Sequence, residues 1–273
     1  MRIHHLDCGS MTPPGGRWLG VPQGPWGPAR LACHCLLLEL PDRLVLVDAG
    51  LGLQDVDDPL RRLGPGFLGI ARPELEPAQT ALRQVQALGF RPQDVSDVLI
   101  THMDFDHVGG LADFPWARVH VAFAEQQAAS APRSRTERQR YRPVQWSHGP
   151  QWVAHGSGGE AWMGFGGVRP LTGLGPDLLR VPLLGHTRGH TGYAVRSDGG
   201  WVLHAGDAIF DRRELGFWRH PPVALRAYLR GLAEDPRERK RSRAALAHCH
   251  QENGHEVEIL CTHEAAALRE GLR

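Results

Sequence analysis

The stretch THMDFDHVGG, residues 101–110, decides the fold and the chemistry that we expect of this chain. Two histidines and two aspartates stand close together in it: His102, Asp104, Asp106 and His107. The apolar run DVLI precedes them, and a strand that ends there would deliver these side chains to one edge of a sheet. Such groups would repel one another or lose hydration at high cost unless a cation lay among them. The stretch therefore predicts a divalent-metal site, and Gly109 and Gly110 allow a tight turn into a following helix.

Three further apolar runs end in side chains of the same kind. LLGHTRGHTGYAV supplies His186 and His190, VLHAGDAIF supplies Asp207, and EILCTHE supplies His263. If the stretch at 101–110 stood alone, its histidines could be ordinary loop residues and its aspartates could cap the next helix. Four strand ends bearing histidine or aspartate favour the metal site over that alternative.

Strands and helices are expected along most of the chain. Apolar or β-branched runs predict strands over 2–7, 31–40, 43–50, 94–102, 117–123, 177–185, 191–197, 200–207 and 256–263. Helical spacing of apolar residues and flanking glycines or prolines predict helices over 77–90, 221–236 and 236–254. This order of elements predicts sheets that are covered by helices.

The segment from about 124 to 170 shows no sustained period and is expected to be a loop-rich excursion. Its aromatic residues favour a packed segment, in which Trp146, His148, Trp152 and His155 would either roof an apolar pocket or pack against the sheets. The basic run RSRTERQRYR within it and RERKRSR near the C-terminus are expected to be solvated helix faces.

The composition is that of a compact enzyme. The 273 residues carry 31 basic and 30 acidic side chains, so no overall field would draw the chain onto nucleic acid or an anionic membrane. Neither an apolar stretch of membrane-spanning length nor an N-terminal signal pattern occurs, and we expect a cytoplasmic protein. The five cysteines are expected to be reduced and buried. Cys33 and Cys35 could clip a metal around His34, but two alternating strand residues that face a core are favoured.

In their order, these segments resemble the signature of the metallo-β-lactamase superfamily, T-H-x-H-x-D-H, then G-H-T-x-G-H, then G-D, and then a final histidine. Asp48 in LVDAG matches a buried aspartate of that family. The resemblance spans nearly the whole chain. It implies an α/β fold, a four-layer αββα sandwich, as a single domain over residues 1–273, with the metal site at one edge between the sheets.

The resemblance also implies which residues bind two divalent ions. The first site would take His102, Asp104 and His190, the second would take Asp106, His107 and His263, and Asp207 would bridge both. His186 is expected to brace its loop by hydrogen bonds, while His34 and His204 are expected to lie behind the ligands or in the core.

Asp104 departs from the family signature, which usually has histidine there. A carboxylate reaches about as far from the backbone, but it lowers the net charge of the centre by one unit and so weakens its Lewis acidity. We expect zinc, with manganese or iron as alternatives, because carboxylate ligands suit harder ions.

A metal pair of this kind lowers the pKa of a bound water and polarises the bond under attack. The resemblance therefore implies a metallo-hydrolase in which Asp106 orients the attacking hydroxide. Its lactonase-like branch implies a small-molecule lactone, ester or amide as substrate. The alternatives are a phosphodiesterase or nuclease of the same superfamily, a mononuclear iron oxygenase of sulfur compounds, and a non-catalytic metal-binding scaffold. We expect no nucleic-acid or membrane partner, and a homodimer is left open.

Overall fold

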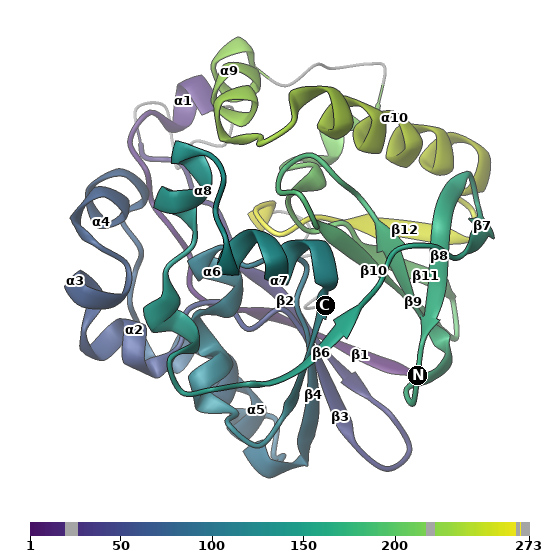
Figure 1. The fold of residues 1–273 in the computed structure, drawn as a ribbon, viewed down its shortest axis with the longest axis horizontal. Coiled ribbons are helices and arrows are strands. Elements are labelled where there is room, and N and C mark those ends of the chain that lie inside the picture. The colour runs from purple at the N-terminus through teal and green to yellow at the C-terminus, as the bar shows by residue number, and fades with distance from the viewer. Residues whose placement is uncertain (20–26, 217–221, 266–267, 269–273) are drawn as a thin grey trace.

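Two six-stranded sheets form the centre of the computed structural model, which describes residues 1–19, 27–216, 222–265 and 268 (Figure 1). The first sheet has the order β1 (Arg2–Asp7), β2 (His34–Glu39), β3 (Leu44–Val47), β4 (Val95–Leu99), β5 (Arg118–Ala122), β6 (Gln151–His155). The second has the order β12 (Val257–Leu260), β11 (Gly200–His204), β10 (Thr191–Ser197), β9 (Gly175–Pro182), β8 (Phe165–Leu171), β7 (Glu160–Trp162). Strands β3 to β6 pair in parallel, as do β11 and β12, and the other pairs are antiparallel.

Strand β2 shows why the sequences of the central strands are continuous apolar runs. Leu36 and Leu38 point to the interface between the two sheets, where Leu178 and Val195 of the second sheet meet them. Cys35 and Leu37 point the other way, into a core beneath the helices of the first sheet. Because both faces are buried, no polar alternation survives along the strand.

The helices form the outer layers. They are α1 (Gly16–Leu19), α2 (Leu53–Asp57), α3 (Pro59–Arg62), α4 (Pro65–Ala71), α5 (Ala81–Ala87), α6 (Phe105–Val108), α7 (Phe123–Ser130), α8 (Arg135–Arg140), α9 (Val223–Leu232) and α10 (Pro236–Asn253). Val85 of α5 and Ala128 of α7 pack beneath the first sheet, whereas Leu246 and Cys249 of α10 pack beneath the second. The described residues thus form the expected αββα sandwich, and we propose that residues 1–273 are one domain because the two sheets share an apolar interface.

The nine predicted strands and three predicted helices are all present. β1 and β10 have the expected bounds, and the others are shorter than expected or shifted. Residue 221, the first of the predicted helix 221–236, lies outside the described residues. The expectation of a loop-rich excursion at 124–170 is wrong, because α7, α8, β6, β7 and β8 occupy most of it. Strands β6 and β7 have exposed and partly buried residues only, so they carry little of the apolar signal that identifies a strand in sequence. No helix among the described residues is long and apolar enough to cross a membrane.

Candidate metal centre

The loop that follows β4 is fixed by Asp48, at the end of β3. The Asp48 carboxylate accepts hydrogen bonds from the Thr101 backbone N–H at 2.7 Å and from the Thr101 hydroxyl at 2.9 Å. It also lies 2.8 Å from Nδ1 of His107. The strand end and the start of α6 are therefore held to one buried anion, as the resemblance implies for Asp48.

Hydrogen bonds on the far side of three imidazole rings determine where their lone pairs point. The Thr101 hydroxyl donates to Asp48, so Nδ1 of His102, 3.0 Å from that oxygen, must be the donor of its contact. Nδ1 of His107 donates to Asp48, and Nδ1 of His263 donates to the Ala32 carbonyl at 2.8 Å. In the neutral ring, donation from Nδ1 leaves Nε2 unprotonated, and this is the form in which imidazole binds a metal.

These Nε2 atoms converge on the carboxylate of Asp207. Nε2 of His107 lies 3.4 Å from Oδ1 of Asp207, and Nε2 of His263 lies 3.1 Å from Oδ2. Nε2 of His102 is 3.9 Å from Oδ2. Oδ2 of Asp106 lies 3.7 Å from Nε2 of His263 and 3.9 Å from Nε2 of His107, and burial raises the Asp106 pKa.

Several of these buried atoms have no hydrogen-bond partner among the described residues. They are Nε2 of His102, Nε2 of His107 and Oδ1 of Asp207. A buried polar atom without a partner costs free energy, and donors at these separations are suited to sharing a cation. The donor set therefore fits divalent metal. Among the described residues, the ligand atoms form three groups: His102, His186 and Asp207; His107, Asp207 and His263; and Cys33, Asp106 and His263.

His186, rather than His190, faces the carboxylates of Asp104 and Asp207 in the structure. Nε2 of His186 lies 3.3 Å from Oδ2 of Asp104 and 3.5 Å from Oδ2 of Asp207. Nε2 of His190 instead accepts the backbone N–H of Asp207 at 3.0 Å. A Cβ on Gly206 would approach that nitrogen to 2.7 Å, which shows how tightly the His190 ring is packed. Spacing alone could not distinguish two histidines in one turn.

Arg140, from the basic run of α8, enters the site beside Asp104. Its Nη1 lies 2.9 Å from Oδ2 of Asp104 and 2.9 Å from Nε2 of His186, and its Nη2 donates to the Leu232 carbonyl. Burial alone would raise the Asp104 pKa, but the Arg140 guanidinium and His102 hold it well below its usual range. The expectation that this whole basic run is a solvated face is therefore wrong for Arg140.

Glu125, at the start of α7, connects the two loops that carry the histidines. It is fully buried, and its Oε1 accepts the Met103 backbone N–H at 2.9 Å and the Tyr141 hydroxyl at 3.0 Å. Its Oε2 accepts the Gly189 N–H at 3.0 Å. A Cβ on Gly189 would come within 2.2 Å of the Glu125 backbone nitrogen, so glycine is required at this close approach. Neither Glu125 nor Arg140 could be identified from the sequence, because neither belongs to the histidine- and aspartate-bearing motifs from which the site was predicted.

An apolar wall lies against the histidines, but residues 146–155 do not form it. Trp146 and Trp152 pack on the core beneath the first sheet, which favours packing over the pocket roof. The Phe210 ring lies 4.5 Å from that of His263 and 6.2 Å from that of His186. Phe210 packs with Leu225, Leu229 and Leu232 of α9, so α9 lies over this side of the site.

Comparisons with known proteins agree with this geometry. A family model described as the Metallo-beta-lactamase superfamily matches residues 28–248. The "probable metallo-hydrolase Rv2300c" of Mycobacterium tuberculosis is 41% identical over 264 residues, covering 97% of this chain and 80% of that protein. The N-acyl homoserine lactonase AttM of Rhizobium johnstonii is 33% identical over 96 residues, covering 35% of this chain and 36% of that protein. A solved N-acyl homoserine lactone hydrolase, with N-hexanoyl-L-homoserine at its catalytic metal centre, superposes with a TM-score of 0.72 at 18% identity, covering 98% of this chain and 95% of that one.

Proposed function

This chain belongs to the metallo-β-lactamase superfamily and is a metallo-hydrolase, and from that premise we propose that it cleaves a small-molecule lactone, ester or amide at a centre of two divalent ions. One observation carries the proposal. The Nε2 atoms of His102 and His107 are buried without partners, and their Nδ1 atoms are already engaged in hydrogen bonds. A cation bound between them would satisfy both.

We assign the donors to two sites, which share Asp207. The first site comprises His102, Asp104, His186 and Asp207, and the second comprises Asp106, His107, Asp207 and His263. His186 replaces His190 in this set because its ring faces Asp104 and Asp207. In the first site Arg140 forms hydrogen bonds with Asp104 and His186 and would compete with a metal ion for both side chains. We therefore expect the second site to bind its ion more tightly.

Bound ions would supply Lewis acidity and a water activated at neutral pH. The chain's own residues supply the orientation. The carboxylate of Asp106 lies at the second site. We propose that it accepts a hydrogen bond from the attacking water and thereby orients that water toward the substrate. Asp48 and the Ala32 carbonyl keep His107 and His263 in the tautomer that leaves Nε2 free. Phe210 excludes water from one side of the histidines.

Zinc is the proposed metal, because four imidazoles and three carboxylates at close range fit its preferences. Because three of the proposed ligands are carboxylates, which suit harder ions, manganese or iron are the alternatives. All five cysteines, Cys8, Cys33, Cys35, Cys249 and Cys261, are free and buried, which supports the proposed cytoplasmic location. A small molecule is the proposed partner, without nucleic acid or membrane, and a homodimer stays an open alternative.

The substrate class rests on the Phe210 and α9 wall and on the relatives that act on N-acyl homoserine lactones. A lactone with an apolar acyl group fits a metal centre bordered by an aromatic ring. Phosphodiesters are the second candidate, because a cavity of about 540 Å³ between α9 and α10 is lined by basic side chains. They are Arg226, Arg230, Arg237, Arg239, Lys240 and Arg243.

Metal analysis combined with a hydrolysis panel tests the function. The purified protein, loaded with zinc or manganese, is assayed on acyl homoserine lactones, aryl esters, β-lactams and bis-phosphodiesters. We expect two ions per chain at saturation and the highest kcat/KM on lactones. If only the phosphodiester were hydrolysed, phosphodiesters would replace lactones as the favoured substrate class. A metal-saturated protein that holds at most one ion per chain would contradict the assignment of two sites.

A further inference from the structure

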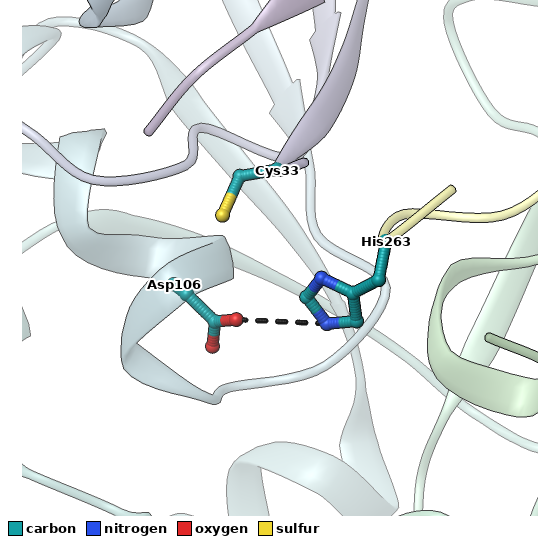
Figure 2. A group of neighbouring side chains, drawn as sticks. All are labelled: Cys33, Asp106 and His263. Atoms are coloured by element: carbon teal, nitrogen blue, oxygen red, sulfur yellow. Dashed lines mark ion pairs between the residues drawn. The ribbon is translucent and has the colours of Figure 1, made fainter. Parts of the chain in front are cut away.

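Cys33 brings a thiol to the edge of the metal centre. It directly precedes β2 and is fully buried. Its Sγ, a carboxylate oxygen of Asp106 and a ring nitrogen of His263 all lie within 4.8 Å of one another. Figure 2 shows the sulfur directed toward the space between the other two side chains, which come from α6 and from the loop after β12. Its neighbour two residues along, Cys35, instead faces the core beneath the first sheet.

Backbone hydrogen bonds fix where this thiol lies relative to His263. The Ala32 carbonyl accepts Nδ1 of His263 at 2.8 Å, and the His34 N–H donates to the Thr262 carbonyl at 3.0 Å. The Cys33 carbonyl accepts the Cys8 N–H at 2.8 Å. The segment that orients the His263 ring is therefore the same segment that presents the Cys33 sulfur.

A second observation at this place points to a ligand independently of the cysteine. Nε2 of His107 is fully buried, has no hydrogen-bond partner, and groups with Asp207 and His263. The group that contains Cys33 shares His263 with it. The thiol thus lies within 4.8 Å of the Asp106 carboxylate and of His263, and His263 also belongs to the group that contains the unsatisfied imidazole nitrogen of His107.

We propose that Cys33 is a thiolate ligand of the ion in the second site, in addition to Asp106, His107, Asp207 and His263. The inference rests on the proposed metal centre, but not on its substrate. On coordination the S–H bond breaks, its proton passes to water, a metal–sulfur bond forms, and no electrons are transferred. A soft sulfur donor favours zinc or cobalt over manganese, and so opposes the preference for harder ions that the carboxylates introduce.

Cobalt substitution tests this assignment without any assay of hydrolysis. The full chain loaded with Co²⁺ should show the intense near-ultraviolet absorption of a thiolate-to-cobalt charge transfer. X-ray absorption of the zinc-loaded protein should show a sulfur at about 2.3 Å. Cys33→Ala and Cys33→Ser should abolish both signals and weaken zinc binding at least about tenfold, since changes even beyond the ligand shell cost 10–100-fold. Cys35→Ala is the matched control and should keep both signals.

The outcomes separate this inference from the proposed function. Wild-type protein that binds cobalt and zinc through nitrogen and oxygen alone would overturn the inference, and Cys33 would then be only a core cysteine packed with Met11, Leu31 and Ala71. The sulfur signals in a protein that hydrolyses none of the panel would uphold the ligand and refute the proposed activity. Signals that survive in Cys33→Ala but vanish in Cys35→Ala would also overturn it.

Discussion

Nη1 of Arg140 lies 2.9 Å from Oδ2 of Asp104, and the two side chains form an ion pair whose arginine is 6% exposed and whose aspartate is 17% exposed. The pair changes the charge balance expected from the sequence. If the Cys33 thiolate is left out of the count, the proposed two dications, three carboxylates and a hydroxide sum to zero, and the guanidinium restores one positive unit. Asp104 and Arg140 together therefore replace the histidine of the usual signature with no net loss of charge.

Asp104→His, which recreates the usual signature, is expected to weaken the protein. It leaves the buried Arg140 guanidinium without its carboxylate, and an uncompensated buried charge costs about 3 kcal/mol or more. The double variant Asp104→His/Arg140→Met should recover both stability and first-site metal content. Thermal unfolding of the metal-free proteins and elemental analysis after reconstitution measure the two effects.

Arg140→Met alone is the fourth corner of this cycle and frees Asp104 and His186 for a metal. It should raise affinity for the more weakly held ion. A single Asp104→His protein as stable and metal-rich as the double variant would show that the ion pair does not matter.

His186→Ala and His190→Ala should have opposite signatures. The first should lose about one equivalent of metal and most hydrolysis, because its ring faces Asp104 and Asp207. The second should keep its metal in the folded protein but lower the free energy of unfolding by about 2–4 kcal/mol, since it empties a buried, tightly packed position. Metal content and urea unfolding of both variants decide the matter. Metal loss confined to His190→Ala would restore the expectation from the sequence.

Glu125→Gln should impair stability and catalysis together. One carboxylate oxygen that accepts a backbone N–H, from Met103 or Gly189, becomes an amide NH₂ that cannot accept. We expect a loss of about 2–3 kcal/mol, as for hydrogen bonds to charged groups, and a lower kcat/KM because both loops shift. Tyr141→Phe, which removes only a hydroxyl donor to the same carboxylate, is the milder control and should cost about 1 kcal/mol. Equal losses in the two variants would argue against the bridging role.

Asp113 should make the protein less stable as the pH rises. Burial raises its pKa to about 6, although its Oδ2 accepts the Leu53 N–H at 3.0 Å. A carboxyl whose folded pKa exceeds its unfolded value contributes stability below pH 4 and loses it as the pH rises through 6. Asp113→Asn keeps an acceptor and removes the charge, so it should stabilise the protein by up to about 2–3 kcal/mol at pH 7.5 and hardly at pH 4. Unfolding at both pH values measures this, and an unchanged difference between wild type and variant would contradict it.

The sequence by itself determined the sandwich and predicted most of the proposed metal centre. The strands β2 and β3 are mostly apolar on both faces, β4 ends in an apolar run, and the polar clusters follow strand ends, so local patterns were sufficient to predict both. Asp106 and His107 were recognisable from their place after β4, Asp207 from its place after β11, and His263 from its place after β12. The sequence pattern that identifies these four residues is local, and recognising it requires no knowledge of contacts between distant parts of the chain.

Only the tertiary structure decided which ring of the 186–190 turn faces the carboxylates, and that Arg140 pairs with Asp104 across 36 residues. The same holds for Glu125, which joins loops at Met103 and Gly189, and for Cys33, whose sulfur approaches Asp106 and His263. The physical reason is common to all four. Residues that are distant in the chain decide which histidine lone pair is free and which buried charge is compensated. The spacing of residues along the sequence carries no information about these distant partners.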